Sequence, residues 1–365
     1  MIFDFIILAV ILFAITLFVF YLIQYNSDNQ FITLVNNLDR HPPEPLRVQK
    51  IDEMSIVMVA GGPVYGKLAI NNCRTLRSLG CVLPIYIFTL HNEYIDAEID
   101  EYANVFELPP GLTGWSAKVE ALIECPSRHV ILLDADNVPL VDPTYLFHTE
   151  EYTKNGCILW PDVQALDDTS SGYRLFGLKT GFDNTGKLRF SSIASVIASC
   201  HLIADACEAG QIVMDTETHA DGLAYIRELN INRHIVYNTL HGDKDTYSLG
   251  LQLADNEYHM TQFQPGIGGT LDSSGVFHGF SLLQRDVVEG YPIFAHYCGP
   301  HKNAQEKITH YQLPHKGEWA TFITDVFSRA SSYENVQVLK FPDVVAIHHN
   351  SDNNRYGETH ADNGT

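Results

Sequence analysis

The stretch "SRHVILLDADNVPLVDPTYLF", residues 127–147, joins a strongly apolar segment to a cluster of polar side chains. Residues 130–133 have the composition of a buried β-strand. Three polar residues follow at its end: Asp134, Asp136 and Asn137. Two carboxylates beside a buried strand are costly in free energy unless a cation neutralises them. Because Asp and Asn oxygens suit Mg²⁺ and Mn²⁺, which bind phosphate oxygens, the stretch predicts a site for a metal-bridged diphosphate.

The segments before this stretch predict strand-helix-strand units and a parallel sheet. Residues 54–62, "MSIVMVAGG", and residues 82–90, "VLPIYIFTL", are strand-like runs. The positions that recur at helical spacing between them are Leu68, Asn72, Leu76 and Leu79. A second helix is predicted over residues 115–125, "WSAKVEALIEC", and it carries Lys118. Ligands of open α/β sheets bind beyond the carboxyl ends of the strands, where Asp134 and Asp136 are expected to lie.

Composition limits the class of protein. The chain has 365 residues, of which 45% are hydrophobic, enough for one large core or two modest ones. Its 44 acidic and 23 basic residues give a formal net charge of −21, which argues against nucleic acid as a partner. The seven cysteines include no CxxC pair, which argues against a zinc module.

An apolar N-terminal segment predicts a membrane anchor. Residues 5–23, "FIILAVILFAITLFVFYLI", are interrupted only by Thr16 and approach the ~20 residues that a helix needs to cross a bilayer. They exceed the roughly 7–15 apolar residues of a cleaved signal peptide. Domain boundaries follow from composition: an anchor over residues 1–25, a Pro-containing stem over 26–50, a folded domain over 51–347 and a disordered tail over 348–365.

A second polar motif lies near the end of the predicted domain. In "IFAHYCGPHKN", residues 293–303, His296, Gly299 and Lys302 form H-x-x-G-x-x-K after an apolar run. An imidazole can complete a Mn²⁺ shell begun by two aspartates. Glycine lets the backbone approach a phosphate, and lysine supplies a positive charge for it. A polar turn after an edge strand is the alternative interpretation of this motif.

Four blocks in this order resemble the fungal α-mannosyltransferase family, whose members extend glycans from a Golgi type II anchor. The blocks are "SAKVEALIECPSRHVILLDADNVPLVDPTYLF", "YTKNGCILWPDV", "CEAGQIVMDTETHADGLAYI" and "GDKDTYSLGL". The resemblance covers about residues 55–303. It implies a GT-A fold, which is an α/β fold with a Rossmann-like mixed sheet, and a retaining glycosyltransferase that uses Mn²⁺ or Mg²⁺. It also implies GDP-mannose as the donor, a glycan or glycoprotein as the acceptor and a lumenal catalytic domain.

The resemblance also implies roles for residues around the metal. Asp134, Asp136 and His296 would be the metal ligands, the last by analogy with glycogenin-like transferases. Lys118 and Lys302 would stabilise the departing diphosphate, near Gly299. Residues that would line the nucleoside pocket at the end of the first strand are Val59, Ala60, Gly61 and Tyr65. Tyr65 has ordinary helix packing as its alternative.

The sugar-binding end follows from the same resemblance. Glu208 or Gln211, in "EAGQ", would stabilise the anomeric carbon during transfer, with a helix-surface carboxylate as the alternative for Glu208. Asp243 and Asp245, a second D-x-D pair, would bind donor-sugar hydroxyls or the acceptor. Two further residues would form the acceptor floor, Trp160 and Asp162, although Trp160 could instead belong to the core.

Several alternatives remain at this stage. No lysine or arginine precedes the predicted membrane span, so a cytosol-facing domain, as in a virus-encoded enzyme, is the alternative to the Golgi lumen. A UDP-glucose or UDP-galactose enzyme is the alternative donor class. Two other protein classes compete with an enzyme of this type: a non-catalytic glycan-binding scaffold, and a phosphohydrolase whose nucleophile belongs to the D-x-D motif.

Overall fold

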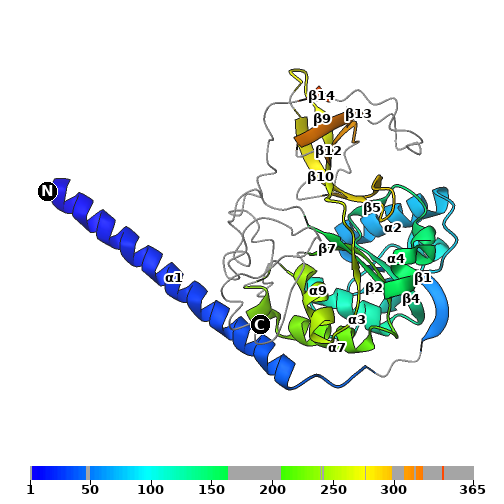
Figure 1. Cartoon of the computed structure of the whole chain (residues 1–365), viewed down its shortest axis with the longest axis horizontal. Helices are drawn as coiled ribbons and strands as arrows, with labels where there is room; N and C mark the ends of the chain where they lie inside the picture. Colours follow the sequence, from blue (N-terminus) through cyan, green and yellow to red (C-terminus); the bar gives the residue numbers. More distant parts are fainter. Residues whose placement is uncertain are drawn as a thin grey trace.

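The computed structural model shows two seven-stranded β-sheets, one of which is covered by helices (Figure 1). It describes residues 2–46, 50–162, 207–238, 240, 242–275, 277–297, 308–315, 318–323 and 339–340. The predicted mixed α/β fold is therefore confirmed, and the predicted disordered tail over 348–365 lies outside the described residues.

The first sheet has the order β3-β2-β1-β4-β7-β6-β8. Its strands are β1 (Ile51–Val59), β2 (Ile85–Thr89), β3 (Asn104–Glu107), β4 (Ser127–Leu133), β6 (Cys157–Pro161), β7 (Cys207–Asp215) and β8 (His259–Met260). The first four are parallel, as the strand-helix-strand pattern predicts. Strand β7 runs antiparallel to both β4 and β6. The beginning of β7 therefore lies at the sheet edge where β4 ends.

Helices cover both faces of this sheet, and each face has its own apolar core. Helix α2 (Gly62–Ser78) packs on one face, with its predicted stripe of Leu68, Asn72 and Leu76 turned inward. The helices on the other face are α3 (Ala117–Glu124), α7 (Ala220–Ile231) and α9 (Lys244–Leu253). Short helices connect them: η1 (Ala97–Glu101), η2 (Gly114–Ser116), η3 (Pro143–His148), α4 (Glu150–Asn155) and α8 (Arg233–Val236).

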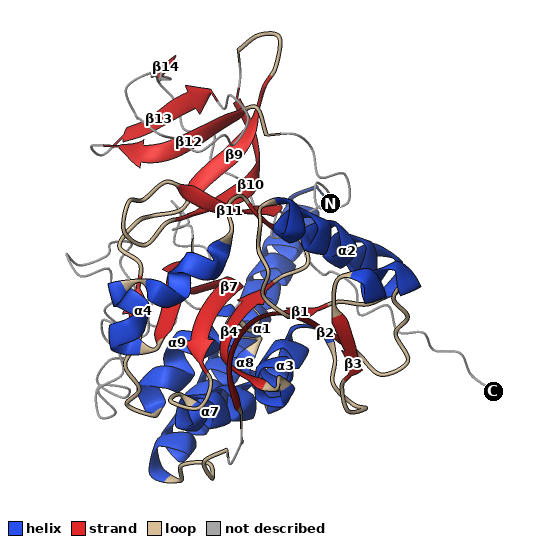
Figure 2. Cartoon of the chain, turned by 90° about the vertical axis from the view of Figure 1, so that its right-hand side faces the viewer, coloured by secondary structure: helices blue, strands red, loops and turns tan. Residues whose placement is uncertain are grey.

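The second sheet is antiparallel and has the order β14-β13-β12-β9-β10-β11-β5 (Figure 2). Its strands are β5 (Asn137–Pro139), β9 (Gly266–Leu271), β10 (Phe277–Arg285), β11 (Pro292–Tyr297), β12 (His310–His315), β13 (Glu318–Ile323) and β14 (Leu339–Lys340). Only residues 134–136 separate β4 of the first sheet from β5 of the second. The predicted metal loop is thus the junction between the two sheets.

The N-terminal segment forms a single long helix, α1 (Ile2–Arg40). Residues 26–40, which the sequence predicts to be part of a stem, are therefore helical. Phe31, Val35 and Leu38 on α1 are buried in a cluster with Leu229 and Val236. The prediction of a spacer over 26–50 is wrong for this part, because its apolar residues recur at helical spacing and have a surface to bury against.

The predicted membrane span over residues 5–23 lies within α1. In the part of the chain that the structure describes, no helix is both long enough and apolar enough to cross a bilayer. The structure does not confirm the predicted span.

Candidate active site

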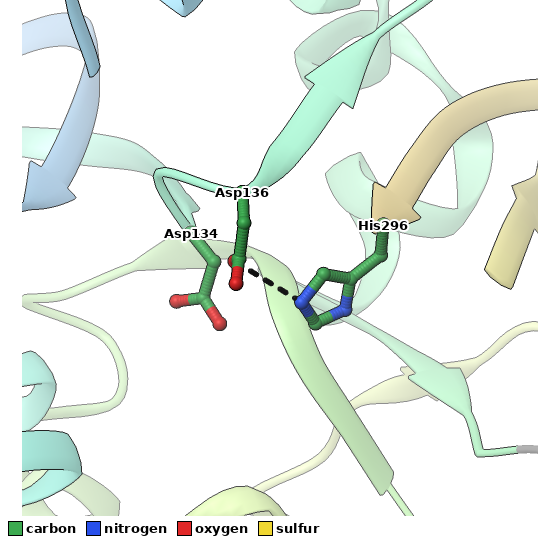
Figure 3. A group of neighbouring side chains, drawn as sticks. All are labelled: Asp134, Asp136 and His296. Carbon is green, nitrogen blue, oxygen red and sulfur yellow. Dashed lines mark ion pairs between the residues drawn. The ribbon is translucent and has the colours of Figure 1, made fainter. Parts of the chain in front are cut away.

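Asp134, Asp136 and His296 form a group suited to hold a metal ion (Figure 3). One ligand atom from each lies within 4.8 Å of the others, and His296 Nε2 is 3.2 Å from Asp136 Oδ1. Strand pairing produces this group, because Asn137 on β5 lies opposite His296 on β11. The amide of Tyr297 also donates to the carbonyl of Asp136 at 3.0 Å. Two carboxylates and an imidazole are a donor set that fits Mn²⁺.

Lys118 connects this group to Asp243. Its ammonium donates to Asp134 Oδ2 at 2.8 Å and lies 3.4 Å from Asp243 Oδ2. It also donates to the carbonyl of Ala209 at 3.3 Å. Burial of Lys118 opposes its charge, but the carboxylates of Asp134 and Asp243 outweigh burial and raise its pKa. Lys118 is therefore a fixed positive charge beside the metal ligands.

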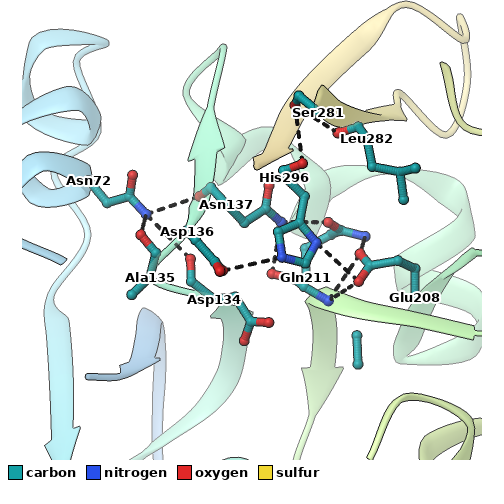
Figure 4. A network of polar contacts seen from close by, with 12 residues as sticks. Asn72, Asp134, Ala135, Asp136, Asn137, Glu208, Gln211, Ser281, Leu282 and His296 are labelled. Carbon is teal, nitrogen blue, oxygen red and sulfur yellow. Dashed lines mark hydrogen bonds and ion pairs between the residues drawn. The ribbon is translucent and has the colours of Figure 1, made fainter. Parts of the chain in front are cut away.

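A hydrogen-bonded network extends behind the metal group (Figure 4). Glu208 Oε1 lies 3.2 Å from His296 Nδ1, and Gln211 donates to Glu208 Oε2 at 3.3 Å. Asn137 donates to Gln211 Oε1 at 2.6 Å and to the carbonyl of Gly210 at 2.8 Å. Glu208 is buried on β7, so the surface-carboxylate alternative for it is wrong.

Burial and neighbouring charges shift the pKa values of Asp134 and His296. Burial, opposed in part by Lys118, raises the pKa of Asp134 to about 6, and the Asp136 carboxylate adds to the rise. Burial would lower the pKa of His296, but Glu208 and Asp136 outweigh burial and raise that pKa well above its usual value. A cation at Nε2 must displace a proton, so metal binding competes with protonation of His296.

Asn72 is a site residue that the sequence analysis did not identify. It lies fully buried on α2, and its side-chain amide donates to the carbonyls of Asn137 at 3.0 Å, Ala135 at 3.1 Å and Asp134 at 3.4 Å (Figure 4). It holds the metal loop to the helix. Its signal in the sequence is an amide at a position where the helical stripe is otherwise apolar.

Asp245 and Asp243 have different partners. Its Oδ1 accepts a hydrogen bond from the Cys207 amide at 2.9 Å, and its Oδ2 pairs with Lys244 at 2.9 Å. Lys244 also pairs with Asp162 at 3.0 Å. This ion-pair group joins the start of α9 to the start of β7 and to the residue after β6. A role for Asp245 in binding the donor sugar or the acceptor stays a prediction.

Trp160 is fully buried, which favours the core alternative over a place in an acceptor floor. Its indole N–H donates to the Arg285 carbonyl at 2.8 Å, and its ring packs edge-on against Phe294. The prediction that Trp160 contacts the acceptor is therefore wrong, since no face of the ring is accessible to a sugar.

The predicted nucleoside residues Val59, Ala60 and Gly61 lie at the end of β1, at the same sheet edge as the metal group, and Tyr65 lies in the first turn of α2. Val59 is half-buried and Ala60 is buried, whereas Tyr65 is 42% exposed. Gly61 lies against Glu93, and a Cβ at this position would fall 2.3 Å from Glu93 Oε2. Two predicted residues of the second motif lie outside the described residues: Gly299 and Lys302.

Relatives of this chain are known from sequence. The α-1,2-mannosyltransferase MNN22 of Candida albicans is 26% identical over 280 residues, which cover 65% of this chain and 48% of that protein. The α-1,2-mannosyltransferase MNN2 of Saccharomyces cerevisiae is 23% identical over 291 residues, which cover 69% of this chain and 47% of that protein. The chain spans about half the length of the curated relatives it matches.

Solved structures with a related arrangement include two glycosyltransferases. The galactosyltransferase LgtC, solved in complex with donor and acceptor sugar analogues, is 13% identical, with a TM-score of 0.38 over 68% of this chain and 88% of that one. The glycosyltransferase GlyE of Streptococcus pneumoniae is 14% identical, with a TM-score of 0.36 over 58% of this chain and 46% of that one.

A family model described as "Mannosyltransferase putative" matches residues 55–286. The match includes Lys118, Asp134, Asp136 and Glu208, and it ends before His296. Because it covers more than half of the sequence, this chain belongs to that mannosyltransferase family.

Proposed function

We propose that this protein is a metal-dependent retaining glycosyltransferase of the GT-A type, which transfers mannose from GDP-mannose to a glycan acceptor. The observation that carries the proposal is the group Asp134, Asp136 and His296 beside the buried Lys118. The family supports the type of reaction, and the relatives named as mannosyltransferases support the sugar. A mixed sheet with the two aspartates directly after β4 supports the fold type.

Different residues of this chain would bind the metal and stabilise the departing diphosphate. Asp134, Asp136 and His296 would hold Mn²⁺, which neutralises charge on the donor diphosphate when bound. Lys118, fixed beside Asp134, would stabilise the negative charge that develops on the departing diphosphate. Asp243 forms a second ion pair with Lys118 and so limits the positions that its ammonium can occupy.

Retention of configuration and the identity of the donor are parts of the proposal that rest on the family resemblance. A UDP-hexose remains the alternative donor. A glycan-binding scaffold that lacks turnover is the alternative from another class of protein. Donor hydrolysis distinguishes a GDP-mannose enzyme, a UDP-hexose enzyme and a scaffold without turnover.

The test is donor hydrolysis by the full chain with GDP-mannose, UDP-glucose and UDP-galactose, each with Mn²⁺ or with EDTA. We expect Mn²⁺-dependent release of GDP from GDP-mannose, and loss of at least about 100-fold in Asp136→Asn, since a metal carboxylate is removed. Asp100→Asn, at an exposed aspartate on η1, is the matched control.

The outcomes separate the alternatives. Turnover of a UDP-hexose alone would replace the proposed donor, and metal-dependent nucleotide binding without any turnover, even with added mannosides, would favour the scaffold. Turnover that is equal in EDTA would contradict metal dependence.

We also propose membrane anchoring and a Golgi type II placement, which rest on the sequence of residues 5–23 alone. Protease protection of the C-terminal domain in sealed membranes tests this placement. Cleavage of the domain from the cytosolic side would support the alternative in which the catalytic domain faces the cytosol.

A further inference from the structure

The imidazole of His296 is held from both sides by carboxylates. Its Nε2 faces the metal group, 3.2 Å from Asp136 Oδ1, and its Nδ1 faces away, 3.2 Å from Glu208 Oε1. A carboxylate can only accept a hydrogen bond, so Nδ1 carries the proton in the contact with Glu208. Nε2 likewise donates to Asp136, so a cation at Nε2 would displace that proton while the contact with Glu208 keeps the other proton on Nδ1.

Glu208 itself is held in one orientation. Both of its oxygens accept from the amide of Gly210, at 3.0 and 3.1 Å, and Gln211 donates to Oε2. Glu208 is 8% exposed and Gln211 is fully buried, so rearrangement would break buried hydrogen bonds.

Close packing at Gly210 strengthens this geometry. A Cβ at Gly210 would lie 2.7 Å from His296 Nδ1 and 2.8 Å from Glu208 Oε2. The absence of a side chain at Gly210 therefore leaves the space in which Glu208 of β7 contacts His296 of β11. The sequence "EAGQ" therefore supplies the carboxylate of Glu208, the space left at Gly210 and the side-chain amide of Gln211, which donates to the carboxylate.

We propose that Glu208 is a positioning residue for the metal site, which fixes the tautomer and orientation of His296 rather than contacting the donor sugar. Metal-binding histidines commonly donate their second nitrogen to a carboxylate, and loss of that partner costs 10–100-fold in affinity. The inference rests on the metal site of the proposed function, and it replaces the role at the anomeric carbon that the sequence analysis assigns to Glu208.

The test is calorimetric titration of Mn²⁺ into the full chain, without donor. Glu208→Gln keeps the size of the side chain and removes its charge, and Glu208→Ala removes the contact. We expect Mn²⁺ affinity to fall about 10–100-fold in Glu208→Ala and less in Glu208→Gln, whose side-chain carbonyl can still accept from Nδ1.

The matched control is Glu120→Gln. Glu120 lies on α3, outside the metal group, and is buried to a similar extent as Glu208. It pairs with Arg227 of α7 at 2.7 Å. We expect it to leave the Mn²⁺ affinity unchanged. Far-UV circular dichroism of every variant separates loss of metal binding from loss of fold, and Glu208→Gln keeps the test possible if Glu208→Ala does not fold.

Three results would overturn the inference, and they differ in what else they overturn. Unchanged Mn²⁺ affinity in folded Glu208→Ala and Glu208→Gln would reject the positioning role and leave the proposed function standing. If these variants kept the wild-type Mn²⁺ affinity but turned over the donor more slowly, Glu208 would instead act on the donor sugar. No Mn²⁺ binding by the wild-type chain would reject the metal site, and the proposed metal dependence with it.

Discussion

Asn72 holds the metal loop, residues 134–137, to helix α2. Its amide holds three backbone carbonyls across the junction between β4 and β5. Backbone carbonyls left buried without a donor cost free energy, because water cannot reach them. The amide therefore serves the site indirectly, by placing Asp134 and Asp136 on either side of a short, constrained turn.

We predict that Asn72→Ala lowers the free energy of unfolding by about 1–3 kcal/mol and weakens Mn²⁺ binding in parallel, because the carbonyls of the metal loop lose the hydrogen bonds that they accept from the Asn72 amide. Urea denaturation and Mn²⁺ titration measure the two effects. Lys67→Ala, at an exposed position of the same helix, is the control. A loss of stability with unchanged Mn²⁺ affinity would show that the loop keeps its shape without the amide.

The ends of β4 and β7 are joined by an ion pair that should make stability depend on pH. Arg128 on β4 donates to both oxygens of Asp215 on β7, at 2.9 and 2.7 Å. Burial would raise the pKa of Asp215, but the hydrogen bonds from Arg128 and Thr218 outweigh burial and hold that pKa at about 2. Because the folded pKa is depressed, the stabilisation is complete above the unfolded pKa of about 4 and disappears as the pH falls towards 2.

We predict that Asp215→Asn destabilises the protein by about 2 kcal/mol at pH 6, and that the difference from wild type shrinks between about pH 4 and pH 2. Urea denaturation at pH 6, 4 and 3 measures it. Asp100→Asn, at an exposed carboxylate, should show no such pH-dependent difference. A wild-type advantage that stays constant down to pH 3 or rises on acidification would contradict the assigned ion pair.

Helix α1 is joined to the body by its C-terminal part. Phe31 is 1% exposed and packs with Tyr225, Leu229 and Val236 of the helices on the same face. We predict that Phe31→Ala destabilises this attachment by about 3 kcal/mol, since it removes a large buried side chain. Limited proteolysis between residues 41 and 50 should then become faster than in wild type. Gln30→Ala, at the exposed neighbouring position, should be cleaved at the wild-type rate.

The same contact matters for any shortened form of the protein. Removal of residues 1–50 would expose the apolar surface that Phe31, Val35 and Leu38 cover on α7 and α8. Measurements of activity are therefore best made on the full chain.

At the scale of the whole molecule, the metal group joins the two sheets. Asp134 and Asp136 follow β4 of the first sheet, and His296 lies on β11 of the second. A cation bound by all three would tie the sheets together, so binding should stabilise the folded chain. A ligand that binds only the folded state at 100 times its Kd contributes about 2.7 kcal/mol.

We predict that Mn²⁺ raises the Tm of the wild-type chain by several degrees and that EDTA reverses the rise. In His296→Ala the rise should be smaller than in wild type, because the second sheet no longer supplies a ligand. His278→Ala, at an exposed histidine of β10 in the same sheet, is the control and should respond as wild type does. An equal rise in His296→Ala would place the cation elsewhere.

Local patterns in the sequence determined much of the architecture. The strand-helix-strand units around β1, α2 and β2, and the position of Asp134 and Asp136 after β4, follow from apolar periodicity over a few turns or strand residues. The grouping of His296 with the aspartates was predicted instead from the ligand chemistry of the two motifs and from the resemblance to a family. Periodicity alone does not reveal it, because roughly 160 residues separate the two segments in the chain.

Tertiary structure alone decided what several polar side chains touch. Glu208 faces His296, Asp245 accepts from the Cys207 amide, and Asn72 holds the metal loop. The sequence shows the residue types, and it also shows the helical spacing that Asn72 shares with its apolar neighbours. The hydrogen-bond partners of these side chains, however, depend on how distant strands pair and helices pack. Each buried polar group is stable only with a partner that the rest of the fold brings within hydrogen-bonding distance.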